Sequence, residues 1–168
     1  LQSRNLMSQL DKLDIESVNI EHLLRVHDQE YIDTVIEISE RGGGLLDEGD
    51  TVACKFSYQA ANLAASGVIQ ASSAIMQKSI KNAFCAVRPP GHHALSSRAM
   101  GFCIFNNISL VARYLQENYS IKRILIIDFD VHHGNGTQDI FYDDSSVYFF
   151  STHQYPFYPG TGSADEIG

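Results

Sequence analysis

The chain has 168 residues, of which 12 are Lys or Arg and 20 are Asp or Glu, so its formal net charge is −8. At about 100–200 residues per domain, this length accommodates one domain. A composition of 44% hydrophobic and 19% charged residues excludes a disordered polymer. The acidic balance argues against direct nucleic-acid binding, and no apolar run of about 18 residues predicts a membrane span. The three cysteines lack a Cys-x-x-Cys spacing, which favours free thiols in the cytoplasm, or in the nucleus of a eukaryote.

Helical patterns dominate the first part of the chain. An opening helix is predicted by the spacing of Leu6, Met7, Leu10 and Leu13. A second helix, capped by Asp28 and ended by the glycines at 42–44, would carry on one face Ile32, Val35 and Ile36. The polar stretch 43–51 predicts an exposed loop. A long alanine-rich helix follows, whose small and apolar face would lie close against a sheet: Ala61, Ala64, Ala65, Val68, Ser72, Ile75 and Met76.

Strand patterns appear in the rest of the chain. Residues 83–87 form an apolar run that ends just before Pro89, which predicts a buried strand followed by a rigid turn. Residues 124–127 predict a strand buried on both faces, and residues 147–150 predict another. Between the strands predicted at 83–87 and 124–127, an amphipathic helix is predicted by the spacing of Ile108, Val111, Ala112 and Leu115. This alternation indicates an α/β fold with a parallel sheet, where ligands bind at the carboxyl ends of the strands.

Asp128, Asp130 and His132 alternate at the end of the strand predicted at 124–127. In extended backbone these three side chains share one side. A carboxylate and an imidazole two positions apart can hold one divalent ion, and mixed nitrogen and oxygen ligands suit zinc or iron(II). A single pair of this kind is more often an acidic strand end that caps a helix. Two adjacent buried carboxylates, however, are unfavourable without a cation or strong hydrogen-bond donors, and this favours a metal site.

Two adjacent histidines, His92 and His93, follow the strand predicted at 83–87. A lone histidine is more often a packed or surface residue. A tandem pair at a strand end, facing a metal candidate on a neighbouring strand, is typical of general acid–base chemistry. Asp128 is expected to orient one of these imidazoles through its ring N–H, and Asn135 the other.

Four motifs carry a resemblance to a known family: Arg-Pro-Pro-Gly-His-His-Ala at 88–94, Gly-Phe-Cys-Ile-Phe-Asn-Asn at 101–107, Asp-Phe-Asp-Val-His-His-Gly-Asn-Gly-Thr-Gln at 128–138 and Tyr-Pro-Gly-Thr-Gly at 158–162. They resemble, in order, the signatures of the zinc-dependent histone deacetylase superfamily, which includes acetylpolyamine amidohydrolases and acetoin-utilisation proteins. Weaker similarity reaches back to residues 25–28 and 31–32. Asn135 stands where the first class of the family usually has Asp, and in this respect the sequence resembles the class II-like and bacterial branch. The resemblance implies a three-layer α/β/α arginase/deacetylase-like fold, with residues 1–168 as the N-terminal portion of the catalytic domain.

The resemblance also implies roles for matching residues. Asp130 and His132 would be two of the three zinc ligands. His92 and His93 would activate the zinc-bound water and protonate the leaving amine, with Asp128 behind His92 and Asn135 behind His93. Gly101 and Phe102 would form one wall of an acyl-lysine channel. The opposite wall would be Tyr158, and an inner potassium site would involve Asp128, Asp130, His132, Ser151 and Thr152.

The family's third zinc ligand and its oxyanion-polarising Tyr have no match in this sequence. The absence of an initial Met and the end at Gly168 suggest a fragment, and the 168-residue piece alone is expected to be weak or inactive. The stretch 42–51 is expected to lie at the rim of the channel. Its acidic side chains would attract a basic substrate or simply be solvated: Asp47, Glu48 and Asp50.

The leading interpretation is zinc-dependent hydrolysis of acetyl-lysine in histones or other proteins. Acetylated polyamines and longer acyl groups would fit the same channel. An alternative from another class is a catalytically incomplete fragment or pseudoenzyme that acts as a binding module. A binuclear manganese hydrolase of the arginase type would need more carboxylates than the loop at 128–132 supplies.

Overall fold

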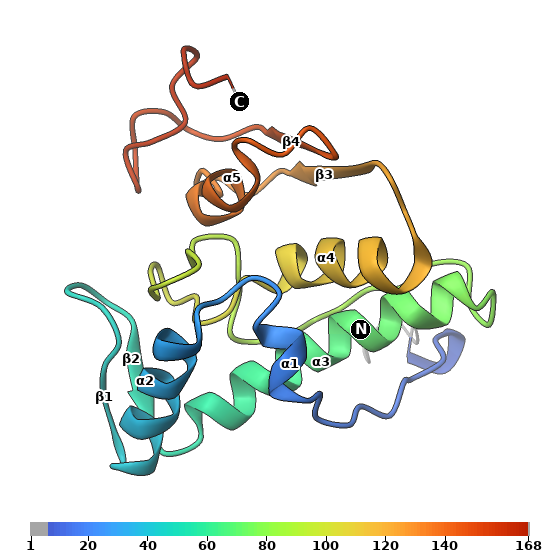
Figure 1. Cartoon of the computed structure of the whole chain (residues 1–168), viewed down its shortest axis with the longest axis horizontal. Helices are drawn as coiled ribbons and strands as arrows, with labels where there is room; N and C mark the ends of the chain where they lie inside the picture. Colours follow the sequence, from blue (N-terminus) through green and yellow to red (C-terminus); the bar gives the residue numbers. More distant parts are fainter. Residues whose placement is uncertain (1–6, 168) are drawn as a thin grey trace.

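The computed structural model describes residues 7–167. Its elements in chain order are a 3-10 turn at Met7–Gln9, α1 (Ile20–Leu23), α2 (Gln29–Glu40), β1 (Gly43–Leu45), β2 (Val52–Cys54), α3 (Ser57–Met76), α4 (Asn107–Tyr119), β3 (Ile124–Asp128), α5 (Asn135–Phe141) and β4 (Val147–Ser151). Figure 1 shows α1 to α4 packed together, with β3, β4 and α5 above them. No helix within the described range is long and apolar enough to cross a membrane.

Two hydrophobic clusters hold these groups of elements together. The larger cluster joins the four helices around Phe105, and its other fully buried members include Leu23, Ile32, Val35, Ala65 and Leu110. The smaller cluster joins α4 to the two strands and α5 through Ala112, Ile126, Phe141 and Val147. Full burial of a side chain such as Leu or Phe contributes about 1.5–3 kcal/mol, so these clusters fix the sheet against α4.

Strands β3 and β4 pair in parallel, with a register that runs from Ile124 opposite Val147 to Asp128 opposite Ser151. The α/β fold with parallel strands is therefore confirmed. Because Asp128 and Ser151 are partners, the loops that follow the two strands start at the same edge of the sheet. Strands β1 and β2 form a separate antiparallel hairpin.

The three longest predicted helices are confirmed as α2, α3 and α4. The alanine-rich α3 packs mainly against α4 and α2 and also touches β2, rather than lying against the parallel sheet of β3 and β4. On α4 the buried residues include Leu110 and Ala112, whereas Ile108, which the prediction placed on the buried face, is exposed. The prediction of an opening helix is wrong for residues 7–13, because only the 3-10 turn forms there. Leu6, which belongs to the same prediction, lies outside the described residues. Exposed Leu10 and Leu13 bury no helical face, so packing does not stabilise a helix at this position.

One strand prediction and one burial prediction are also wrong. Residues 83–87 form no strand, and Phe84 is 85% exposed, because no neighbouring strand pairs with this run in the described part of the chain. Strand β3 is not buried on both faces, since Leu125 and Ile127 are 60% and 57% exposed. The stretch 43–51 is only partly a loop, because Gly43 already begins β1 of the hairpin.

Candidate active site

Three loops meet at the carboxyl edge of β3 and β4. Main-chain hydrogen bonds tie them together: Thr137 N–H donates to the His92 carbonyl (3.1 Å), and Thr152 N–H donates to the Asp128 carbonyl (2.9 Å). Helix α5 lies against the histidine loop at Gly136, where a Cβ atom would run into the carbonyl group of Ala94. Glycine is therefore required at this position for the histidine loop and α5 to lie in contact.

The two adjacent histidines lie over this edge, and each is held by a different partner. His92 Nδ1 lies 2.8 Å from Asp128 Oδ2, and His93 Nδ1 lies 2.8 Å from Asn135 Oδ1. The two rings are 4.0 Å apart between centroids. Both partner oxygens are acceptors, so each Nδ1 carries the hydrogen and each Nε2 is left free to accept or donate a proton. The structure thus brings together the two pairs that the sequence expects to meet, while their catalytic roles stay predictions.

The pKa values of His93 and Asp128 are both lowered, but for different reasons. His93 is 4% exposed, and burial together with the nearby charge of His92 lowers its pKa to about 4, against the opposing effect of the Asn135 hydrogen bond. Burial alone would raise the pKa of Asp128, but the hydrogen bond from His92 and its positive charge hold that pKa below the usual value. The neutral form of His93 and the charged form of Asp128 are therefore favoured at neutral pH.

Asp130 and His132 form the candidate metal pair. Asp130 Oδ1 accepts a hydrogen bond from the His132 amide (2.8 Å) and lies 3.1 Å from His132 Nδ1. A carboxylate oxygen and an imidazole nitrogen thus converge, and they are donors of the kinds that zinc takes in proteins. Within residues 7–167, no group of three or more His, Cys, Asp or Glu side chains gathers around a common point. The residues present therefore fit two ligands of a zinc site.

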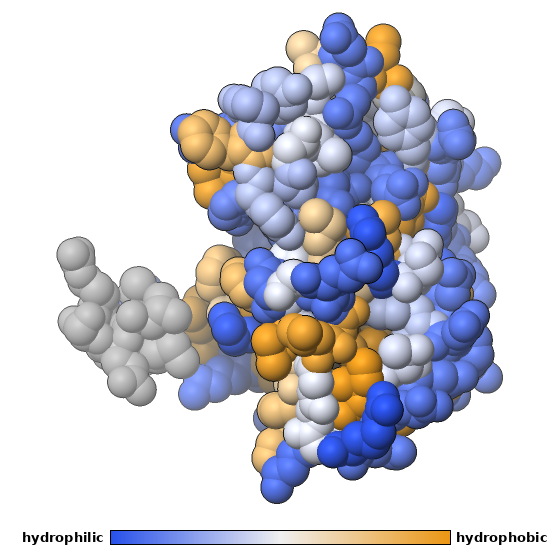
Figure 2. Space-filling model, turned by 90° about the vertical axis from the view of Figure 1, so that its left-hand side faces the viewer, coloured by the Kyte–Doolittle hydropathy of each residue, from blue (hydrophilic) through white to orange (hydrophobic). Residues whose placement is uncertain are grey.

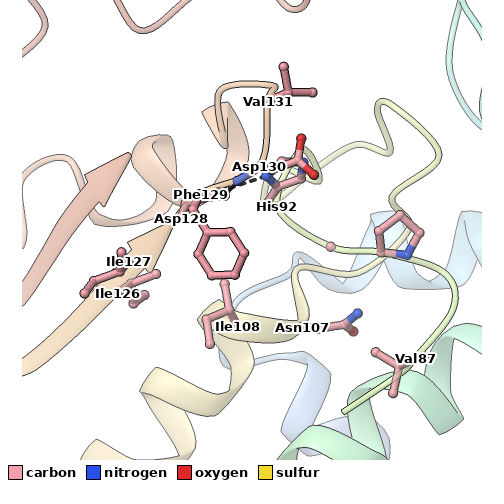
Figure 3. A pocket seen from close by; sticks show the side chains of 12 residues that line it. Val87, His92, Asn107, Ile108, Ile126, Ile127, Asp128, Phe129, Asp130 and Val131 are labelled. Atoms are coloured by element: carbon pink, nitrogen blue, oxygen red, sulfur yellow. Dashed lines mark hydrogen bonds and ion pairs between the residues drawn. The ribbon is translucent and has the colours of Figure 1, made fainter. Parts of the chain in front are cut away.

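Figure 3 shows His92, Asp128 and Asp130 at one end of a cavity of about 560 Å³. The rest of its wall is mostly apolar and comes from the turn at 87–91, from α4 and from β3, with Ile108, Ile126, Ile127 and Phe129 among its residues. Both the buried Ile126 and the exposed Ile127 line this cavity, so it lies along β3 beside the turn at 87–91.

The residues of the predicted potassium site gather at the same edge. Asp128 and Ser151 are register partners, and the Asp128 carbonyl accepts the Thr152 N–H. The Ser151 hydroxyl lies 2.8 Å from His153 Nδ1. Because His153 Nε2 lies 2.8 Å from the Gly162 carbonyl, Nε2 carries the hydrogen, and Ser151 donates to Nδ1. The coordination of potassium stays a prediction.

The predicted channel residues lie next to His93. The Tyr158 ring meets the His93 ring edge to face at 5.1 Å between centroids, and the His132 ring at 5.8 Å. A Cβ atom at Gly101 would lie within 2.9 Å of the Tyr158 hydroxyl and would overlap the His93 ring. Phe102, the next residue, is 59% exposed. Gly101 and Tyr158 therefore border the approach to His93, with Phe102 on the solvent side of Gly101.

A buried polar network beneath the histidine pair was not predicted from the sequence. His27 Nε2 accepts the Asn106 N–H (2.9 Å), and its Nδ1 donates to the Ser96 carbonyl (3.2 Å). The Asn106 amide donates in turn to the Ala94 carbonyl (3.0 Å) and to Thr137 Oγ1 (3.3 Å). The network thus supports the residues that flank His93. The one available signal was the weak similarity at 25–28, which contains His27 but gives it no role.

A second set of contacts fastens the segment that follows β4. His133, 2% exposed, lies 2.8 Å through Nδ1 from Thr161 Oγ1 and 2.9 Å through Nε2 from Gln138 Oε1. Gln138 donates to Glu166 (2.7 Å), whose other carboxylate oxygen accepts the Gly162 N–H (3.0 Å). These bonds hold the segment that carries Tyr158 against α5. Its long-range partners could not be read from local sequence patterns.

Comparisons with known proteins agree with this geometry. Residues 1–168 match the histone deacetylase domain family. The chain is 44% identical over 150 residues to a "Probable deacetylase" of Archaeoglobus fulgidus, covering 89% of this chain and 41% of that protein. It is 47% identical over 130 residues to human "Histone deacetylase 9", covering 75% of this chain and 13% of that protein.

A solved structure shows the same likeness in three dimensions. The crystal structure of the HDA15 HD domain superposes with a TM-score of 0.92 at 38% identity, covering 99% of this chain and 50% of that one. The chain thus spans at most about half of the proteins described here. With the family match over its whole length, the chain belongs to the histone deacetylase family and has part of that family's α/β domain.

Proposed function

We propose that this chain is the N-terminal portion of a zinc-dependent deacetylase domain that hydrolyses acetyl-lysine amides. The observation that carries the proposal is the histidine pair: each Nδ1 is held by Asp128 or Asn135, which leaves two Nε2 atoms free beside Asp130 and His132. Relatives named as deacetylases support the reaction class.

The residues divide the chemistry of amide hydrolysis between them. A bound zinc ion would polarise the amide carbonyl and acidify a water, and Asp130 and His132 would supply two of its ligands. His92, whose Nδ1 is held by Asp128 so that its Nε2 faces away from that carboxylate, would accept the proton from water. His93 is neutral at neutral pH because its pKa is about 4, so the proton taken from water would have to reach His93 before it could be passed to the departing amine, a transfer for which a group of low pKa is the stronger acid.

The remaining part of the site would come from the rest of the domain. The chain covers 50% of the HDA15 domain structure, and the face of β3 that carries Leu125 and Ile127 is exposed. We propose that the C-terminal part of the domain covers this surface and adds the third zinc ligand and the donor that polarises the carbonyl. A catalytically incomplete protein that binds acetylated lysine is the second candidate, because the described residues supply only two metal ligands.

The substrate is tested with the full-length protein. We expect zinc-loaded protein to release acetate from an acetyl-lysine peptide in a hydroxamate-sensitive way, with one zinc per chain. Activity on acetylated polyamines alone would mean that the substrate is an acetylated polyamine and not acetyl-lysine in a protein. Two manganese ions per chain would contradict the zinc site, and tight peptide binding without acetate release would favour the binding module.

A further inference from the structure

A strained turn carries the channel residue Phe102. Met100 and Cys103 exchange two main-chain hydrogen bonds, Met100 N–H to the Cys103 carbonyl (3.1 Å) and Cys103 N–H to the Met100 carbonyl (2.9 Å). Between them, Gly101 (φ 57°) and Phe102 (φ 66°) are both left-handed. Glycine adopts this conformation freely, but a bulky residue such as Phe does so only when its surroundings hold it there, because its Cβ crowds the following carbonyl oxygen.

The group that holds Phe102 comes from the distant β1–β2 hairpin. The Phe102 N–H donates to Thr51 Oγ1 at 3.1 Å, across 51 residues of sequence. Thr51 is 2% exposed, so its hydroxyl has little water to bind instead. The hydroxyl hydrogen goes to Asp47 Oδ2 at 2.6 Å rather than to the more distant Asp50 Oδ1 at 3.4 Å, which turns the oxygen lone pairs towards Phe102.

Asp47 is itself fixed within the hairpin. Its Oδ1 accepts the N–H groups of Gly49 and Thr51, both at 3.0 Å. Burial opposes ionisation of Asp47, but the hydrogen bonds from Thr51 and Gly49 outweigh it and lower the pKa of the carboxyl group. A charged acceptor strengthens its hydrogen bond and orients the Thr51 hydroxyl in one direction. Asp47 is thus engaged inside the hairpin, unlike a solvated rim carboxylate.

We propose that Thr51, oriented by Asp47, is a positioning residue that fixes the Phe102 wall of the substrate channel. The proposal rests on the proposed deacetylase function for the role of Phe102 as a channel wall. The hydrogen bonds that restrain Phe102 do not depend on that function. Figure 2 shows the side of the molecule that carries the hairpin, where hydrophobic side chains gather in the lower half. The hairpin then sets the width of the channel mouth through Thr51, although no hairpin residue has to touch the acyl chain.

The test compares three variants of the full-length protein. Thr51→Val keeps the shape but removes the hydroxyl, Thr51→Ser keeps the hydroxyl, and Thr34→Val makes the same change on an exposed face of α2. Because a lost neutral hydrogen bond corresponds to about a tenfold change, we expect Thr51→Val to speed hydrogen exchange of the Phe102 amide and to raise KM for an acetyl-lysine peptide by about that factor. The value of kcat should change by less than about twofold, since the histidine pair is untouched. Thr51→Ser should restore both readouts, and Thr34→Val should leave them at wild-type values.

A double variant separates positioning from general stability. In a Phe102→Gly background the turn needs no restraint, so adding Thr51→Val should leave KM unchanged. Unchanged Phe102 exchange and KM in Thr51→Val, or an equal rise of KM in both backgrounds, would overturn the positioning role. Failure of the proposed function is distinguishable, because an inactive wild-type protein would still show the Thr51-dependent exchange of the Phe102 amide, which supports the restraint on the turn.

Discussion

At the scale of single residues, the two histidines are made different by their partners. Asp128 is a carboxylate and Asn135 an amide, yet both accept a hydrogen bond from an Nδ1 at 2.8 Å. A carboxylate stabilises an imidazolium more than an amide does. The residue pattern alone predicted that Asp128 and Asn135 would each orient one of the two histidines, and the family resemblance assigned Asp128 to His92 and Asn135 to His93.

Asn135→Asp should make His93 easier to protonate. A negative charge at the atom that accepts the His93 Nδ1–H adds to the existing hydrogen bond, so the pKa of His93 rises from its value of about 4. We expect the basic limb of the pH–rate profile of the full-length enzyme to move to higher pH. Asn118→Asp, which adds the same charge on an exposed turn of α4, is the control. An unchanged basic limb in Asn135→Asp would count against the role of His93.

His27 should make the fold sensitive to acid. Burial lowers its pKa from 6.5 to about 4, so between these values the unfolded chain binds more protons than the folded one. Stability is therefore complete above about pH 6.5 and falls as the pH drops towards about 4, by an amount on the order of 3 kcal/mol. Urea unfolding at several pH values should show a shallower pH dependence for His27→Gln than for the wild-type protein. Parallel curves for the two proteins would mean that His27 is not buried in its neutral form.

At the scale of helices and strands, local patterns predicted what local interactions determine. The spacing of apolar residues identified α2, α3 and α4, and the aliphatic and aromatic runs identified β3 and β4. The run at 83–87 has an equally good strand pattern, yet forms none, because a strand exists only with a hydrogen-bonded neighbour. The hairpin of β1 and β2 was missed because glycines at 42–44 look like a loop, and the partner of Thr51 lies far away in sequence.

Gly136→Ala should disturb the contact between α5 and the histidine loop. The added methyl group would meet the main chain of His93 and Ala94, which cannot move aside as a flexible side chain can. Overpacking of this kind costs about 1–3 kcal/mol, measured as a lower free energy of unfolding. Gly49→Ala is the matched control, because the nearest heavy atom to its new Cβ would be 3.9 Å away. Equal stability of the two variants would show that α5 is free to shift.

At the scale of the whole molecule, the open side of β3 is the main feature that the sequence did not anticipate. A run of four aliphatic residues was expected to be buried on both faces, but only the face of Ile126 is covered by the described residues. The expectation was drawn from the pattern of complete parallel sheets. If the rest of the deacetylase domain covers this side, β3 is buried on both faces in the longer protein, as its four aliphatic residues predict.

Leu125→Lys therefore tests the arrangement of the complete domain. In full-length protein we expect it to lower the free energy of unfolding by about 2–4 kcal/mol, because a lysine charge would be buried beside the strand. Leu10→Lys, at another leucine that is exposed here, should change stability by less than about 0.5 kcal/mol. A Leu125→Lys protein as stable as the control would mean that this face of β3 stays in water.

The central claim is that His93, held by Asn135 beside the Asp130 and His132 pair, takes part in amide hydrolysis. It is tested most directly by acetate release from an acetyl-lysine peptide, comparing full-length wild-type and His93→Ala proteins with equal zinc content. Loss of a general acid–base group predicts a fall of about 10²–10⁴-fold in kcat. An unchanged kcat in a folded, zinc-loaded His93→Ala protein would contradict the account.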